Sequence, residues 1–141
     1  MKIKPLVNNF IKPEYKRDLS GGLDIYFQTD VILNPNQINQ IPLGFASEVP
    51  EGHVALLLPR SSAGIKGIGL RNTVGVIDAD YQGPLMMPLW NHSDKPFKIC
   101  VGDRVAQMLF VPVLHANFEV TEEFEETSER GEEGFGSTGK N

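Results

Sequence analysis

The amino-acid sequence predicts an all-β fold, a distorted jelly roll or β-sandwich. About ten short apolar runs are separated by turn residues every 8 to 12 positions, which is typical of these folds. No window sustains the period of an amphipathic helix. With 141 residues, of which 40% are hydrophobic and 22% charged, the chain is large enough for one globular domain with its own core.

The first half of the chain is expected to form strands that are separated by turns. Asn and Pro favour a turn at residues 34–36, and Pro and Gly favour another at residues 50–52. Asp24 interrupts an apolar alternation, so its side chain is expected to face away from its apolar neighbours. The predicted strands are residues 3–7, 23–27, 30–33, 37–42, 44–48 and 53–58.

The second half is expected to continue with strands at residues 71–77, 83–91, 97–101, 105–113 and 116–120. The first two of these can pair as a hairpin across an acidic loop. Pro84 and Pro88 would place parts of the second strand at a sheet edge or in a bulge. Residues 61–68 are too short and too rich in glycine for a helix, and residues 64–69 are expected to form a loop.

The character of the chain changes at about residue 122, which separates a β-domain of residues 1–121 from a tail of residues 122–141. Residues 119–133 hold eight of the eighteen acidic residues and one basic residue, so the rest of the chain is mildly basic. The tail has no core-forming pattern and is expected to be flexible. Its glycines and hydroxyls could instead bind a phosphate, and Phe135 could stack on a base.

Composition argues against several classes of protein. No apolar run approaches the roughly 18 residues that span a bilayer, and the start has no signal-peptide core, so a cytoplasmic protein without a membrane partner is expected. Cys100 is the single cysteine, which excludes an internal disulfide and favours a reducing compartment. The charge distribution is unfavourable for duplex DNA, and no nucleic-acid partner is expected, although one cleft can still attract a small polyanion.

Two carboxylates, Asp78 and Asp80, precede Tyr81 in a glycine-bounded stretch near the middle of the chain. One could act as a general base while the other braces the loop. The same residues also suit an ordinary turn, in which Asp bonds to the backbone and Gly adopts a positive φ. The flanking motifs favour the functional interpretation.

A candidate phosphate site is formed by Arg60, Ser61 and Ser62, because a guanidinium and two hydroxyls suit phosphate oxygens. Asp24 could brace Arg60 or hold a hydrated magnesium ion. The sequence lacks zinc-ligand spacing, a nucleophile elbow, a phosphate loop and a Rossmann glycine pattern. What remains is a carboxylate that activates water for attack on a metal-bound phosphate chain.

Five separated motifs extend from residue 21 to residue 139. They are Gly-Gly-Leu-Asp-Ile-Tyr at 21–26, Pro-Arg-Ser-Ser-Ala-Gly-Ile-Lys-Gly at 59–67, Gly-Val-Ile-Asp-Ala-Asp-Tyr-Gln-Gly at 75–83 with Asn91, Gly-Asp-Arg-Val-Ala-Gln-Met at 102–108, and Arg-Gly-Glu-Glu-Gly-Phe-Gly-Ser-Thr-Gly at 130–139. In this order they resemble the motifs of the homotrimeric dUTPase (deoxyuridine 5′-triphosphate nucleotidohydrolase) family.

The resemblance implies a jelly-roll homotrimer with active sites shared between subunits and with magnesium as the cofactor. It implies an enzyme that hydrolyses dUTP to dUMP and pyrophosphate, which limits uracil in DNA and supplies dUMP for dTMP synthesis. By this resemblance, Asp78 takes a proton from the water that attacks the α-phosphorus, and Gln107 helps to hold that water. Asp24 is implied to contact the metal indirectly, through water.

The resemblance also assigns residues that bind the substrate. The phosphates are expected at Arg60, Ser61, Ser62, Arg130, Gly136, Ser137 and Thr138. The uracil and the deoxyribose are expected at Asn72, Gly75, Ile77, Tyr81, Met86 and Phe135. The ring of Tyr81 would leave no room for a ribose 2′-hydroxyl, and the tail would close over the substrate and exclude water.

Three positions depart from the family pattern. Gly21 stands where alanine is common, Glu133 stands where glycine is usual, and Pro88 is unexpected inside a strand. Glu133 adds negative charge near the phosphates, so tail closure is expected to be weaker or more dependent on magnesium.

Three other classes of protein agree less well with these residues. A dCTP deaminase of the same fold would need an acid on the strand after the central loop, and residues 85–91 contain none. A non-catalytic trimer that senses dUTP or binds a partner would not need Asp78, Gln107 and Arg130 together. A structural jelly roll such as a coat protein would leave the five motifs unexplained.

Overall fold

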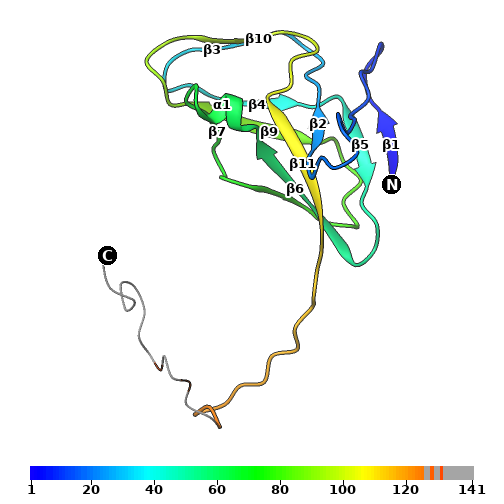
Figure 1. The fold of residues 1–141 in the computed structure, drawn as a ribbon, viewed down its shortest axis with the longest axis vertical. Coiled ribbons are helices and arrows are strands. Elements are labelled where there is room, and N and C mark those ends of the chain that lie inside the picture. The colour runs from blue at the N-terminus through cyan, green and yellow to red at the C-terminus, as the bar shows by residue number, and fades with distance from the viewer. Residues whose placement is uncertain (126–127, 129–130, 132–141) are drawn as a thin grey trace.

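The computed structural model describes residues 1–125, 128 and 131 of the chain. Nearly all of its regular secondary structure is β-strand, which confirms the predicted class (Figure 1). The elements are β1 (Lys2–Pro5), β2 (Leu23–Ile25), β3 (Val31–Leu33), β4 (Ile38–Pro42), β5 (Phe45–Glu48), β6 (His53–Pro59), α1 (Ser61–Gly64), β7 (Ile68–Leu70), β8 (Gly75–Ile77), β9 (Met86–Asn91), β10 (Phe97–Ile99) and β11 (Ala106–Pro112). The strands predicted in the first half all form, with ends shifted by one or two residues.

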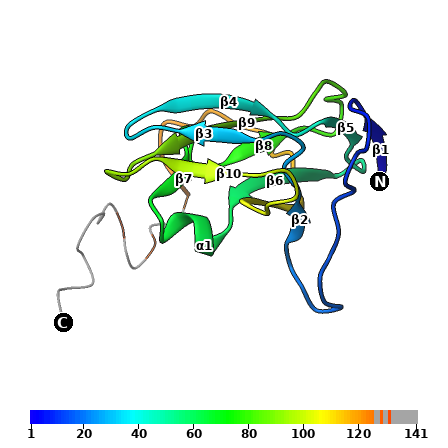
Figure 2. The ribbon, with the colours of Figure 1, turned by 90° about the horizontal axis from the view of Figure 1, so that it is seen from above.

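Two antiparallel sheets make up the body of the domain. One has the strand order β2-β11-β6-β8 and the other has the order β4-β9-β7. The strand pairs β1-β5 and β10-β3 form two smaller sheets. Figure 2 shows β4 and β9 in a layer above β6 and β2. Apolar side chains from both larger sheets belong to one buried cluster, so the sheets pack face to face as a sandwich.

Alternating burial along the strands builds this core. Ala55 and Leu57 of β6 are buried, as are Met87 and Leu89 of β9, whereas the residues between them are partly exposed. Successive side chains of a strand point to opposite faces, so each strand contributes every second residue to the core.

The core also includes side chains from outside the strands. Phe27, which follows β2, is fully buried, and burial of one such side chain stabilises a fold by roughly 1.5–3 kcal/mol.

The predicted hairpin between residues 71–77 and 83–91 is wrong. β8 pairs with β6, with Ile77 opposite Ala55, while β9 lies between β4 and β7 in the other sheet. The expected loop at 64–69 and strand at 71–77 are instead a short strand, β7, a turn and then β8. The residues between β8 and β9 therefore cross from one sheet to the other.

Pro88 lies in the central strand of its sheet, and the prediction of an edge or a bulge is wrong for it. Its carbonyl accepts a hydrogen bond from Arg71 N–H at 2.8 Å, one residue beyond the end of β7 at Leu70. In an antiparallel strand the amide and carbonyl of one residue point to the same side. The missing N–H of Pro88 therefore faces Arg71, one residue beyond β7, and not β4, so the pairing of Pro88 with Gln40 of β4 loses no ladder bond.

Residues 61–64 form one helical turn, α1, where no helix was expected. The carbonyl of Arg60 accepts hydrogen bonds from the amides of Ala63 and Gly64, at 2.9 and 3.1 Å. Ala63 is buried and packs with the core. This tertiary contact stabilises a turn that would be too short to persist in isolation.

Residues 114–125, called here the apolar arm, leave the sandwich after β11 without forming a strand (Figure 1). The predicted strand at residues 116–120 is therefore wrong. Leu114, Phe118 and Val120 are 92%, 94% and 98% exposed. A strand needs a partner for its backbone groups, and the described part of this chain supplies none to the arm. Among the described residues, no helix has the length and apolar character needed to cross a membrane.

Candidate active site

Two predicted site residues, Asp24 and Arg60, lie with Arg104 where three neighbouring strands begin or end. Asp24 is in β2, Arg60 directly follows β6, and Arg104 precedes β11. β11 lies between the other two strands, with Gln107 opposite Asp24 and Ala106 opposite Pro59. The sheet therefore brings residues from three distant parts of the sequence together.

Asp24, Arg60 and Arg104, called here the Asp24 cluster, are joined by ion pairs. Arg60 Nε lies 3.0 Å from Asp24 Oδ1, and Arg104 Nη1 lies 2.9 Å from Asp24 Oδ2. Arg60 Nη1 also donates to the carbonyl of Arg104 at 3.1 Å. Two cations on one carboxylate leave a net positive charge, and Arg60 keeps further N–H donors for an anion. The ion pair with Arg60 thus agrees with the prediction that Asp24 holds the Arg60 side chain in place.

The Asp24 cluster continues into a second charged group through the backbone of Glu14. Glu14 and Asp24 form an isolated antiparallel β-bridge. The nitrogen of Glu14 lies 3.2 Å from the carbonyl oxygen of Asp24, and the nitrogen of Asp24 lies 3.0 Å from that of Glu14. The Lys16 ammonium and the Tyr26 hydroxyl donate to the Glu14 carboxylate. These two hydrogen bonds lower the pKa of Glu14, and the hydrogen bond to Glu14 raises the pKa of Lys16. Both groups therefore stay charged beside the cluster at neutral pH.

The two predicted phosphate-binding serines follow Arg60 directly. Ser61 and Ser62 open α1, and both are exposed. Their hydroxyls make no side-chain hydrogen bond with other described residues. Both are therefore available to a ligand beside the Asp24 cluster.

Gln107 is packed against the backbone of the first motif. Its amide nitrogen lies 3.4 Å from the carbonyl of Pro59. A Cβ atom added to Gly22 would lie 2.3 Å from Gln107 Oε1, closer than real atoms approach, whereas a Cβ on Gly21 would meet nothing within 4 Å. The missing side chain of Gly22 thus makes the space that Gln107 occupies.

The five described residues that were predicted to contact uracil and deoxyribose line one pocket, called here the Tyr81 pocket. Its volume is about 270 Å³, and Asp78 also lines it. The Tyr81 hydroxyl donates to the carbonyl of Pro84 at 2.9 Å, and a Cβ on Gly83 would lie 2.6 Å from that hydroxyl. The complete lining is Gln40, Asn72, Gly75, Val76, Ile77, Asp78, Tyr81, Pro84, Leu85 and Met86.

Within one chain, Asp78 and Gln107 are far apart. Asp78 follows Ile77, which lies opposite Ala55 of β6, whereas Gln107 lies opposite Leu58 of the same strand. Extending the β6–β8 register by one residue puts Asp78 level with Val54, four residues from Leu58 or about 13 Å at the rise of a strand, and β8 and β11 lie on opposite sides of β6. No hydrogen bond or ion pair among the described residues joins the Tyr81 pocket to the Asp24 cluster.

The remaining predicted residues are in the tail. Arg130, Phe135, Gly136, Ser137 and Thr138 lie outside the described residues.

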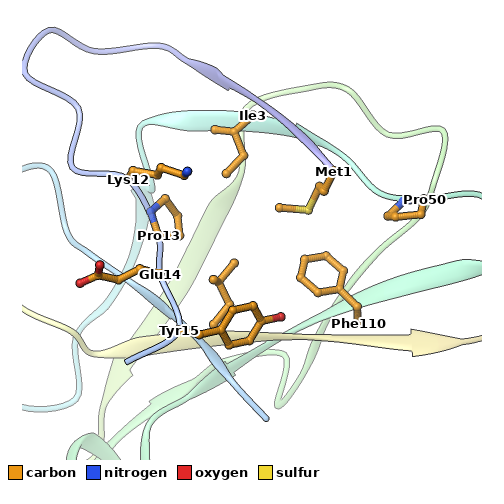
Figure 3. Close-up of a pocket in the computed structure, with 9 residues that line it drawn as sticks. Met1, Ile3, Lys12, Pro13, Glu14, Tyr15, Pro50 and Phe110 are labelled. Atoms are coloured by element: carbon orange, nitrogen blue, oxygen red, sulfur yellow. The ribbon is translucent and has the colours of Figure 1, made fainter. Parts of the chain in front are cut away.

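A larger cavity of about 620 Å³ contains none of the predicted site residues. Figure 3 shows Met1, Ile3, Tyr15 and Phe110 around it, and most of its lining is apolar. A catalytic pocket usually combines an apolar wall with convergent polar groups. The Tyr81 pocket, which holds Asp78, fits that description better despite its smaller volume.

The described residues offer little to a metal on their own. No group of three or more His, Cys, Asp and Glu side chains among them could hold an ion. Both oxygens of Asp24 are engaged by arginines, which agrees with contact through water and not with direct ligation. Magnesium often keeps several waters and takes most other ligands from substrate phosphates, so this arrangement fits a magnesium–phosphate complex.

Two functional residues were missed by the sequence analysis. Arg104 was recognised only as part of a motif, although it completes the Asp24 cluster. Gly22 was likewise not given a role, although it makes room for Gln107. A second arginine placed directly before a strand was the available signal for Arg104, but sequence does not show which carboxylate it meets.

The fold and these two sites define an all-β protein with two arginines paired to one buried aspartate and a separate pocket lined by Asp78 and Tyr81. The family model described as dUTPase matches residues 8–139. The chain therefore belongs to the dUTPase family.

Relatives of nearly the same length agree with this membership. The deoxyuridine 5′-triphosphate nucleotidohydrolase of Actinobacillus pleuropneumoniae serotype 3 (strain JL03) is 50% identical over 94% of this chain and 90% of its own. The protein of the same name from Haemophilus influenzae (strain PittEE) is 47% identical over the same shares.

Solved structures have the same fold. The Staphylococcus bacteriophage 80alpha dUTPase, solved with dUPNHPP, superposes with a TM-score of 0.90 at 31% identity, covering 98% of this chain and 97% of that one. A dUTPase mutant from phage phi11 of S. aureus has a TM-score of 0.81 at 26% identity, covering 89% of this chain and 98% of that one. The latter structure describes the coordination of a structural Mg(II) ion.

We expect Asp24→Asn to lower the free energy of unfolding by about 2 kcal/mol, because two guanidinium groups lose their carboxylate partner and remain partly buried. Urea denaturation followed by fluorescence measures this. Asp18→Asn is the matched control, since Asp18 is exposed and forms no ion pair with another described residue; its effect should stay within about 0.5 kcal/mol. Equal stability of the two variants would contradict the structural role of the cluster.

Proposed function

We propose that the protein hydrolyses dUTP to dUMP and pyrophosphate. The observation that supports this most directly is the Tyr81 pocket, which combines the five described residues expected at the base and sugar with the candidate general base, Asp78. Family membership and the names of the relatives support the same substrate.

Asp78 is the proposed general base, and Gln107 is proposed to hold the attacking water. The water attacks the α-phosphorus, its proton passes to the Asp78 carboxylate, and pyrophosphate leaves. A carboxylate is a weak base, so most of the rate must come from alignment of water with phosphorus and from neutralisation of charge on the phosphate oxygens.

The phosphate chain is proposed to bind at Arg60, Ser61 and Ser62. Asp24 and Arg104 hold the Arg60 guanidinium at Nε and Nη1, so less freedom is lost when the remaining donors meet phosphate oxygens. Magnesium, held by phosphate oxygens and through water by Asp24, would neutralise part of the phosphate charge.

Specificity is proposed to come from the Tyr81 pocket. Tyr81 is fixed against Gly83 by its hydrogen bond to Pro84, so its ring can exclude a ribose 2′-hydroxyl by contact. Asn72 and the neighbouring backbone groups would pair with the edge of uracil, and cytosine would leave a buried polar group unpaired.

The tail, residues 122–141, is proposed to close over the substrate. Arg130, Gly136, Ser137 and Thr138 would bind the phosphates, and Phe135 would cover the uracil. Closure of such a lid excludes water from the reacting phosphorus.

A homotrimer with active sites shared between subunits is proposed for the working protein. Two observations support sharing. Asp78 and Gln107 of one chain are about 13 Å apart along β6 alone, too far to hold the same water. The apolar arm exposes several large hydrophobic side chains, which is the usual property of a surface that another chain covers.

The reaction itself is tested by magnesium-dependent pyrophosphate release from dUTP, dCTP, dTTP and UTP in parallel. We expect cleavage of dUTP alone, and loss of turnover in Asp78→Asn with binding of dUTP retained, because the amide cannot accept the proton. Binding of dUTP without turnover by the unaltered chain would refute the enzymatic function and favour a nucleotide-sensing protein.

Shared sites can be tested by complementation between Asp78→Asn and Gln107→Ala. Each variant alone should be inactive. When chains of the two are coexpressed and assemble at random, about a quarter of the sites would combine an intact Asp78 with an intact Gln107 from a different chain. Activity near that fraction of the unaltered protein is expected, and no recovery would show that one chain supplies both residues.

Gly22→Ala should lower kcat about ten- to a hundredfold with little change in KM, because the added Cβ displaces the end of Gln107 from its place. Gly21→Ala is the matched control and should retain full activity, since its Cβ meets nothing within 4 Å. Denaturation curves of both variants distinguish displacement from misfolding. Equal kcat values for the two variants would contradict the positioning of Gln107 by Gly22.

A further inference from the structure

A small polar cavity lies on the other side of Arg104, between α1 and the turn that leads into β11. Its volume is about 180 Å³, and its lining is Ser62, Ala63, Lys66, Phe97, Lys98, Asp103, Arg104 and Val105. We call it the lysine cavity. It shares no lining residue with the Tyr81 pocket.

The lysine cavity is lined by three cations and one carboxylate. The carboxylate, Asp103, accepts a hydrogen bond from the Cys100 amide at 2.8 Å within its own turn. The Arg104 guanidinium is paired with Asp24, but no ion pair with a described residue involves Lys66 or Lys98. No described carboxylate therefore forms an ion pair with either ammonium group, and both remain able to pair with an anion.

Lys66 is partly pre-positioned. Its ammonium lies 5.9 Å from the centre of the Phe97 ring, within the range of a cation–π interaction. A cation held over a ring loses less freedom when it meets an anion than one that moves freely.

We propose that the lysine cavity binds a small polyanion, inorganic pyrophosphate, as a second anion site. This inference rests on the proposed function, which releases pyrophosphate beside Ser62 and Arg60. Ser62 lines the cavity and Arg104 belongs to both sites, so pyrophosphate can pass from the Asp24 cluster to the lysines by a short movement. Three of the eight residues that line this cavity of about 180 Å³ are cationic, which favours a small inorganic anion.

The test is calorimetric titration of inorganic pyrophosphate into the full chain at low ionic strength, first alone and then with saturating dUPNHPP to fill the substrate site. Lys66→Met and Lys98→Met remove each charge while keeping an unbranched side chain. Lys95→Met is the control, because Lys95 is exposed nearby but does not line the cavity.

We expect binding of pyrophosphate to persist with the analogue present and to weaken about fivefold in each cavity variant, without a change in KM for dUTP or in the Lys95→Met control. Loss of binding once the analogue is present, or equal affinity in all variants, would overturn the second site. The two proposals can fail separately. If the chain does not hydrolyse dUTP but still binds pyrophosphate through Lys66 and Lys98, the proposed function is refuted and the second anion site stands.

Discussion

The site is organised around one buried negative charge. The Asp24 side chain is 9% exposed, and a carboxylate in such a place costs several kcal/mol unless cations compensate it. Arg60 at the end of β6 and Arg104 before β11 provide this compensation. Three strands therefore meet in a fixed relation, and Arg60, one of the cations that stabilise the fold, is also proposed to bind the substrate phosphates. Under that proposal, stability and binding depend on the same side chain.

The family resemblance, and no local pattern, assigned Asn72, Gly75, Ile77, Tyr81 and Met86 to the base and sugar. These residues lie within fifteen positions of one another and line one pocket, while their contact with a ligand stays a prediction. Strand partners were harder to predict, because alternation shows which face of a strand is apolar and not which strand lies beside it. This is why β8 was assigned to a hairpin with β9, and why the partnership of Arg104 with Asp24, across 80 positions, was missed.

The helical turn α1 and Pro88 show a second limit of structure prediction from sequence. Propensity argues against both, since glycine disfavours helices and proline disfavours central strands. Tertiary contacts decide the outcome in each case: Ala63 of α1 packs into the core, and the amide that Pro88 lacks would face Arg71 and not β4. Neither contact is visible until the sheet is assembled.

The apolar arm also bears on how the protein matures. A newly folded chain presents Leu114, Phe118 and Val120 to water, the kind of surface through which incompletely assembled proteins aggregate. If a second copy covers the arm, as proposed, that protection requires a collision between chains, so its rate rises with the square of the concentration. Scarce chains would remain unprotected longest, and production in bursts would favour correct assembly over slow, steady synthesis.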